Sequence, residues 1–351
     1  MFDPKYKLTN KIVADLTHIA EAKAVIERAK LLPQAEVRLR RQALIRMTHS
    51  STAIEGNELN LRQVEAVARG SKINAPVRDI YEVQNYLKAL KYIEQIVKKK
   101  SAITERVILK IHKLVTDKTL RPDESGHYRK SAVYVVRRKW GFPEETLYTG
   151  PDVKKVPRLM ADLVKWIGES EKQNISPVIV AGVVHQEIAA IHPFSDGNGR
   201  TARALATLML YARGYDFRRL FALEDYYNKD RPRYYAAINI GKNYEQRRVD
   251  FTPWLEYFVR GLKDEIDNVK AKVMALSRRK VDGKLETQIY LNPDQLKILD
   301  FMDQMGKITV KDVIDILSIP RRTAQLELQK LKKLKIIKQT GRGPSSAYIS
   351  A

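Results

Sequence analysis

Hydrophobic positions recur at helical spacing along most of the chain. Apolar residues fall every three or four positions within residues 12–26, 37–45, 80–96, 103–115 and 153–166, which is the period of amphipathic helices. Residues 177–191 and 202–211 are apolar nearly throughout, so we expect two helices that are buried on all sides. A further helix is expected over residues 234–262. The pattern predicts a mainly α protein.

Two short segments depart from the helical pattern. Residues 131–136 are rich in β-branched and aromatic side chains, and Thr146–Pro151 has the composition of an extended segment that ends in a turn. We therefore expect a hairpin within residues 130–150.

The C-terminal part of the chain has its own order of elements. Residues 275–290 are polar and charged, which suits a linker. After them we expect a helix from Pro293, a short strand at Ile308–Val310, helices over 311–317 and 321–334, and two strands around a Gly/Pro turn. This is the order of a winged helix-turn-helix. The expected domains are an N-terminal helical region (1–110), a core (111–274), the linker (275–290) and a winged-helix domain (291–351).

Composition narrows the classes of function. The chain has 351 residues with 64 Lys and Arg against 41 Asp and Glu, a net charge of +23 that favours nucleotides, nucleic acids or acidic surfaces as partners. Residues 291–351 contribute +5 of this charge and the preceding residues +18, so charge does not single out a DNA-binding segment. There is no cysteine, which excludes disulfides, a Cys-ligated zinc and a cysteine nucleophile. Without an apolar signal segment or membrane span, we expect a cytoplasmic protein with no membrane contact.

The candidate chemistry lies in His192–Arg203, HPFSDGNGRTAR, between the two most apolar helices. Pro193 cannot continue the first helix, and Gly197 and Gly199 let the backbone turn tightly and approach a ligand. The next helix begins at once, so its first N–H groups and its positive end point into the same loop. Such a helix start is suited to binding a phosphate group.

Four side chains of the loop complete this candidate site. Arg200 and Arg203 share a face of the first helical turn and are directed at one anion. Asp196 supplies a hard oxygen ligand for Mg²⁺, and His192 can take a proton near neutral pH. Asp-Gly-Asn-Gly is also a common turn, and a histidine at a helix end is often only a cap. The combination nevertheless indicates transfer from a Mg²⁺-bound phosphate ester to a hydroxyl group.

The same twelve residues resemble the complete signature of the Fic family, H-x-F-x-D/E-G-N-G-R-x-x-R, at every fixed position. The resemblance implies a Fic-type helical core with a short β-hairpin flap. It also implies transfer of AMP from ATP to a Ser, Thr or Tyr hydroxyl of a target protein or of the enzyme itself. The implied roles are a catalytic base at His192, Mg²⁺ binding by Asp196, an anion hole formed by Gly197, Asn198 and Gly199, phosphate binding by Arg200 and γ-phosphate binding by Arg203.

A second match lies upstream, where residues 51–57 (STAIEGN) resemble the inhibitory-helix motif of the family, S/T-x-x-x-E-G/N. Ser51 and Glu55 are four residues apart and share one face of a helix that can end at Gly56. The resemblance implies that Glu55 pairs with Arg203 and occupies the γ-phosphate site. The enzyme would then be autoinhibited.

Two further regions are assigned by the resemblance. A flap that aligns the backbone of a target by strand addition would comprise Thr146, Leu147, Tyr148, Thr149 and Gly150, although a hairpin can also serve only as cover. The adenosine would be held by Tyr227, Tyr234 and Tyr235, although tyrosines at this spacing also occur in cores.

The sequence does not decide which partner the C-terminal domain binds. A helix that begins at Arg321 and Arg322 would meet DNA phosphates, but winged helices also dock proteins or form a homodimer. Two alternatives to AMP transfer therefore remain. The same loop would transfer another group, such as phosphate or UMP, or the chain would be a nucleotide-sensing DNA-binding regulator.

Overall fold

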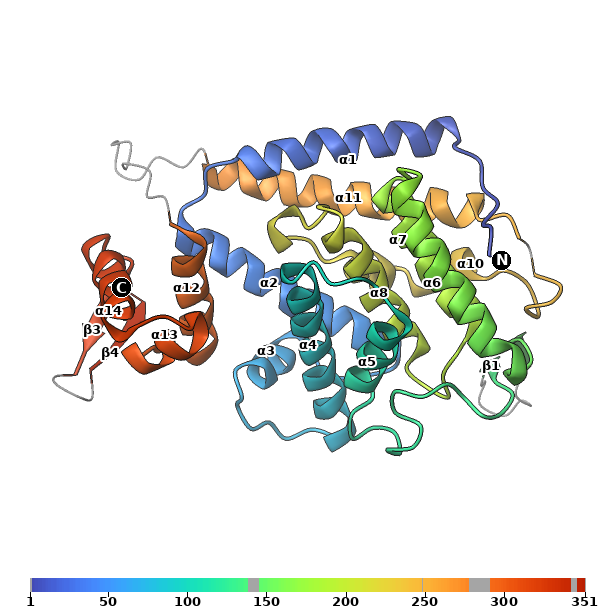
Figure 1. The fold of residues 1–351 in the computed structure, drawn as a ribbon, viewed down its shortest axis with the longest axis horizontal. Helices are drawn as coiled ribbons and strands as arrows, with labels where there is room; N and C mark the ends of the chain where they lie inside the picture. Colours follow the sequence, from blue (N-terminus) through green and yellow to red (C-terminus); the bar gives the residue numbers. More distant parts are fainter. Residues whose placement is uncertain (1, 138–144, 248, 278–290, 342–345, 351) are drawn as a thin grey trace.

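The computed structural model describes residues 2–137, 145–247, 249–277, 291–341 and 346–350, and this part of the chain is mainly helical, as expected (Figure 1). The Thr9 side chain caps the first helix by accepting from the Ile12 N–H, and Pro33 occupies the first turn of the second. The N-terminal helices are α1 (Asn10–Arg28), α2 (Pro33–Ile54), α3 (Leu61–Ala68), α4 (Val77–Lys98) and α5 (Glu105–Val115).

The two most apolar helices form the centre of the molecule, where α7 (Pro177–Ile191) packs against α8 (Asn198–Ala212). Nearly every side chain of both is buried, as their sequences predicted. At one edge α1 lies along α11, which comprises Thr252–Ser277 (Figure 1). The other elements of this region are η1 (Val153–Lys155), α6 (Val156–Lys172), η2 (Phe217–Arg219), α9 (Leu223–Lys229), α10 (Arg231–Ile238) and α11 (Thr252–Ser277).

The single helix expected over residues 234–262 is wrong, because the chain leaves the helix after Ile238 and re-enters it at Thr252. Local polar turns replace the helix between these points. The Asn239 side chain accepts from the Gly241 N–H at 2.9 Å, and Gly241 has a φ of 131°. Such side-chain turns compete with helical hydrogen bonds.

The expected hairpin is present as β1 (Tyr134–Arg137) and β2 (Glu145–Thr149), which pair antiparallel. The register runs from Tyr134 opposite Thr149 to Arg137 opposite Glu145, with an irregularity that leaves Leu147 without a direct partner. Residues 138–144 lie outside the described part.

One hydrophobic core joins the N-terminal helices to the rest of the helical region. It contains Ile12 of α1, Ile108 of α5 and Val273 of α11. The core does not divide at residue 110, where we expected the N-terminal region to end, because α5 runs across that position. The N-terminal helices therefore help to position the central loop.

The C-terminal elements have a hydrophobic core of their own, which Val37 of α2 joins. The strand expected at Ile308–Val310 is wrong: Thr309 caps α13, and Ile308 forms only a bridge to Tyr348. The linker expected at 275–290 overlaps α11, which continues to Ser277, and residues 278–290 lie outside the described part. The elements are α12 (Pro293–Met305), α13 (Val310–Leu317), α14 (Arg321–Lys333), β3 (Ile337–Thr340) and β4 (Ala347–Ser350). Their assignment to a winged-helix domain stays a prediction.

In the described residues, every helix falls short of the length and apolarity that crossing a bilayer requires.

Candidate active site

The loop between α7 and α8 is held in a tight turn by its own residues. His192 ends α7 with a left-handed φ of 48°, and Gly197 precedes α8 with a φ of 75°. The Asn198 side chain closes the turn, because it accepts from the Phe194 N–H at 3.0 Å and donates to the Phe194 carbonyl at 2.9 Å. Asn198 therefore offers an anion its backbone amide, since its side chain is engaged within the loop.

His192 has the properties of a base. The His192 Nδ1 lies 3.2 Å from the Ala189 carbonyl, which can only accept, so Nδ1 carries the proton and Nε2 is the basic nitrogen. Burial lowers the pKa of this half-buried imidazole below its usual value. The ring is therefore neutral at pH 7 and able to take a proton.

The two arginines of the first turn of α8 are almost fully buried and face different carboxylates. The Nη1 of Arg200 lies 3.2 Å from Oε1 of Glu82, and its Nη2 lies 3.6 Å from Oδ1 of Asp196. The Nη2 of Arg203 lies 2.7 Å from Oε1 of Glu55. The first N–H groups of α8 have no acceptor within the helix. Positive charge and free donors thus gather at the start of α8.

The upstream motif lies directly on Arg203. Ser51 accepts twice from this guanidinium, through its hydroxyl at 3.0 Å and its carbonyl at 2.8 Å. The helix α2 ends at Ile54, so Glu55 is its C-cap and Gly56 follows with a φ of 95°. Burial alone would lower the pKa of Arg203, but the Glu55 carboxylate, together with the nearby Tyr234 and Tyr86, more than offsets burial and raises this pKa above the usual value.

The Glu55 carboxylate also covers the backbone of Gly199. A Cβ atom added at Gly199 would come within 2.2 Å of Oε1 of Glu55 and 3.1 Å of Nη1 of Arg203. Only a glycine leaves room here for the carboxylate beside the start of the helix. Glu55 therefore occupies space that a phosphate bound to Arg203 and to these amides would need.

Asp196 lies at the partly exposed rim of the loop. Its Oδ1 accepts from the Gly197 N–H at 2.5 Å, and its Oδ2 accepts from Nη2 of Arg78 at 3.2 Å. In the described residues, no group of three or more His, Asp or Glu side chains could hold a metal ion alone. A metal at Asp196 would share its coordination with a bound substrate or with water.

The expected flap residues belong to β2 and the turn that follows it. The Tyr148 side chain is buried, and its hydroxyl donates to the Ala190 carbonyl at 2.6 Å. Thr149 donates to the Lys242 carbonyl at 2.9 Å, while Gly150 donates to the Val133 carbonyl at 3.2 Å. Thr146 is exposed and Leu147 half-buried. The hairpin is thus anchored beside α7 at its Thr149 end.

The three tyrosines expected near adenosine have different environments. Tyr227 and Tyr234 are buried and stack at 4.6 Å between ring centroids, and the Tyr234 hydroxyl lies 3.0 Å from Nε2 of His185. Tyr235 is 49% exposed, and its hydroxyl donates to the Ile54 carbonyl. Only Tyr235 therefore presents its ring to solvent, next to the end of the helix that carries Glu55.

Two residues that the sequence analysis did not assign to the site hold the loop in place. His112 stacks on Phe194 at 3.7 Å, and its Nε2 lies 3.0 Å from the Asp196 carbonyl. Arg129 donates to the His192 carbonyl at 2.9 Å, and its amide donates to the Pro193 carbonyl at 2.9 Å. No local motif marks either residue, because each acts from more than 60 positions away in the chain.

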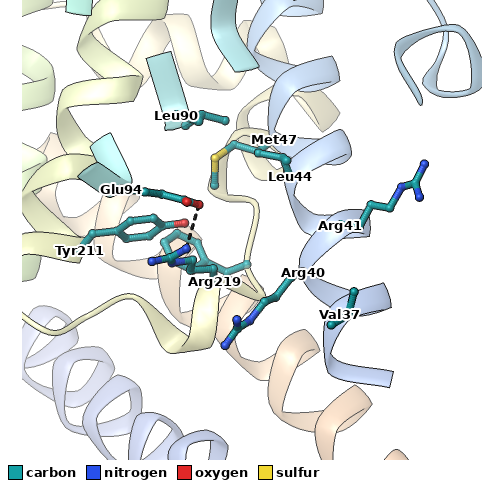
Figure 2. Close-up of a pocket in the computed structure, with 10 residues that line it drawn as sticks. Val37, Arg40, Arg41, Leu44, Met47, Leu90, Glu94, Tyr211 and Arg219 are labelled. Carbon is teal, nitrogen blue, oxygen red and sulfur yellow. Dashed lines mark ion pairs between the residues drawn. The ribbon is translucent and has the colours of Figure 1, made fainter. Parts of the chain in front are cut away.

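A pocket lies elsewhere, between α2, α4 and the end of α8 (Figure 2). Figure 2 shows Glu94 and Arg219 facing each other, with the Tyr211 ring beside them and Leu44 and Leu90 on the apolar side. The Nη1 atom of Arg219 lies 3.0 Å from Oε1 of Glu94. No residue of the 192–203 loop lines this pocket. It therefore forms no part of the candidate active site.

The fold and the loop together place buried arginines and free N–H donors beside a neutral imidazole in a helical domain. The chain matches the Fic/DOC family over residues 102–210. It is 30% identical over 202 residues to the protein adenylyltransferase Fic of Drosophila grimshawi, covering 57% of this chain and 38% of that protein. It is 29% identical over 231 residues to the protein of the same name from Nematostella vectensis, covering 65% and 49%. The chain thus spans between about two fifths and half of the length of these relatives.

One solved structure matches the fold over the whole length of the chain. A Fic family protein from Desulfovibrio desulfuricans G20 superposes with a TM-score of 0.64 and 26% identity, covering 100% of this chain and 98% of that one. The likeness extends to the C-terminal elements as well as to the central domain.

Proposed function

We propose that this chain is a protein adenylyltransferase, which transfers AMP from ATP to the hydroxyl group of a target protein or of the chain itself. The observation that carries the proposal is the neutral imidazole of His192 beside a helix start with two buried arginines, each paired with a glutamate. The names of the related proteins support the same activity. A site of this kind binds the phosphates of a nucleotide and deprotonates an incoming hydroxyl.

The reaction follows from these positions. The triphosphate lies on the amides of Gly197, Asn198 and Gly199, with Arg200 and Arg203 neutralising its oxygens. His192 Nε2 takes the proton of the target hydroxyl as the hydroxyl oxygen attacks the α-phosphorus. The bond between the α-phosphorus and the bridging oxygen breaks, and pyrophosphate leaves with that oxygen. The products are an adenylylated side chain and pyrophosphate.

The donor set at Asp196 fits Mg²⁺. This ion is often held by one or two carboxylates, with substrate phosphate oxygens and waters completing its octahedron. Asp196 is a single, partly exposed carboxylate next to the proposed phosphate site, and the cation Arg78 lies against it. When bound, Mg²⁺ would neutralise the charge of the phosphates.

Glu55 holds the enzyme inactive in this proposal. Its carboxylate covers Gly199 and binds Arg203, so it competes with the γ-phosphate. The last turns of α2 are held in place, since the Ser50 hydroxyl donates to Asp225 at 2.6 Å and the Tyr235 hydroxyl donates to the Ile54 carbonyl at 3.0 Å. Activation would therefore move the Glu55 side chain at the helix end and leave the helix in place.

The test is labelling of protein with radioactive nucleotides. We expect the α-phosphate label of ATP to reach protein, and Glu55→Gly to raise this labelling by about 10- to 100-fold, the factor that corresponds to one charged hydrogen bond. The exposed Glu58, three residues further on, provides the matched control, and Glu58→Gly should leave labelling unchanged.

Three outcomes would contradict the proposal. A γ-phosphate label on protein would indicate phosphorylation, and label from UTP alone would indicate transfer of UMP. No label with either nucleotide, even for Glu55→Gly, would favour the alternative that the chain is a nucleotide-sensing DNA-binding regulator. In addition, His192→Ala must abolish labelling while the protein stays folded by circular dichroism.

A further inference from the structure

Glu82 of α4 lies next to the loop of residues 192–203, which we call the phosphate loop. It contacts α4 itself, the segment after α2 and the start of α8. It is 6% exposed, and a buried carboxylate must be paired. Its Oε2 accepts from Nδ2 of Asn57 at 2.9 Å, and its Oε1 accepts from Nε of Arg78 at 3.2 Å. The same Oε1 lies 3.2 Å from Nη1 of Arg200. One carboxylate therefore joins the segment after the inhibitory helix to the arginine of the phosphate loop.

Arg200 is held in place by ion pairs, but two of its nitrogen atoms lack hydrogen-bond acceptors. Its residue is 1% exposed, and Glu82 and Asp196 balance its charge. Neither its Nε nor its Nη1 has a hydrogen-bond acceptor among the described residues, because the approach of Glu82 is not aligned with an N–H bond. Buried donors without acceptors point to a ligand that is absent, and an oxygen-rich anion beside α8 would supply the acceptors.

Nucleotide binding would affect the two carboxylates near Arg200, those of Asp196 and Glu82, differently. Asp196 is partly exposed at the rim of the loop, where its oxygens would bind the proposed Mg²⁺. Glu82 is buried and fixed by Asn57 and Arg78, so it stays with Arg200 when a nucleotide enters. The position of the guanidinium in the bound state thus depends on Glu82.

We propose that Glu82 is a positioning residue, which holds the Arg200 guanidinium in the orientation that binds a nucleoside triphosphate. Asn57 supports Glu82 from the segment that directly follows Glu55. The phosphate site is therefore joined to the inhibitory segment twice: through Glu55 to Arg203, and through Asn57 and Glu82 to Arg200. This proposal rests on the proposed function, because it takes the triphosphate as the ligand.

The test measures equilibrium binding of ATP by calorimetry, which requires no AMP transfer. In the Glu55→Gly protein, Glu82→Gln keeps the size of the side chain and removes its charge. We expect the Kd for ATP to rise about tenfold, since a charged hydrogen bond to phosphate is lost or misdirected. Glu94→Gln is the matched control, because Glu94 also lies on α4 but pairs with Arg219 away from the loop, and its Kd should not change.

A second comparison separates positioning from general damage. With Arg200→Met in the same background, Glu82→Gln should cause no further loss of affinity, because its effect passes through Arg200. An equal loss with and without Arg200 would overturn the proposal, and so would an unchanged Kd for Glu82→Gln. If Glu82→Gln does not fold, Glu82→Asp tests the same point: its shorter side chain withdraws the carboxylate from Arg200, so the Kd for ATP should rise in the Glu55→Gly protein but not when Arg200→Met is also present.

The outcomes also separate this proposal from the proposed function. ATP binding that depends on Glu82, with no α-phosphate label on any protein, would refute adenylyl transfer and support the positioning role. If the Glu55→Gly protein binds no ATP at all, both proposals are overturned.

Discussion

Acid is expected to destabilise this protein through His112, a buried residue that supports the phosphate loop. Its Nδ1 accepts from the Gly126 N–H at 3.0 Å, so Nε2 carries the proton and donates to the Asp196 carbonyl. Protonation of Nδ1 would place two donors face to face within the core. Burial accordingly lowers the pKa of His112 from 6.5 to about 4.

The sign and size of the effect follow from this difference in pKa. Between pH 6.5 and 4 the unfolded chain binds the proton and the native protein does not, so the unfolded state is favoured as the pH falls. The His112 contribution is fully present above pH 6.5. We expect about 2 kcal/mol of stability to be lost by pH 5 and about 3 kcal/mol by pH 4.

Urea unfolding at a series of pH values measures this contribution. His112→Gln removes the titrating ring and is expected to lower stability at pH 7, but its stability should fall less steeply between pH 6.5 and 4 than that of the natural protein. His127→Gln is the matched control, because His127 is an exposed histidine close to the same turn. Parallel pH profiles for the natural protein and His112→Gln would refute the reasoning.

Three further predictions concern the loop. Asn198→Ala removes both hydrogen bonds to Phe194 and should lower the free energy of unfolding, measured in urea titrations, by about 1–3 kcal/mol. An unchanged urea midpoint would show that these two bonds do not hold the loop. Arg129→Met removes the donor to the His192 carbonyl and should lower kcat more than it raises KM for ATP, while a change in KM alone would count against positioning of the base. Because burial lowers the pKa of His192, the acid limb of the rate profile should have its midpoint below pH 6.5, and a midpoint above that value would show a different base.

The helical fold could be predicted from the sequence because its elements have strong local signals. The apolar runs predicted both α7 and α8, with Pro193 following the first and Gly197 preceding the second, although α8 begins four residues before its apolar run. The helix expected over 234–262 failed because Asn239 and Gly241 form a turn that hydrophobic spacing does not register. The β-branched residues Ile308–Val310 predict a short strand, but Thr309 instead caps the helix α13.

The candidate site could be predicted only where it is contiguous in sequence or carries a motif. The loop from His192 to Arg203 and the contact between Glu55 and Arg203 fall in this class. Arg129, His112 and Glu82 do not, because tertiary packing brings them to the loop from distant helices and turns. A lone charged residue on an amphipathic helix gives no signal that its partner lies in a distant loop.

The central claim is that the start of α8 binds a triphosphate once Glu55 is removed. A crystal structure of the Glu55→Gly protein with ATP and Mg²⁺ tests it most directly. We predict phosphate density on the amides of residues 197–199, with the γ-phosphate at Arg203 and the α-phosphorus facing Nε2 of His192. A triphosphate bound elsewhere, or side chains of the chain itself filling this space, would contradict the account.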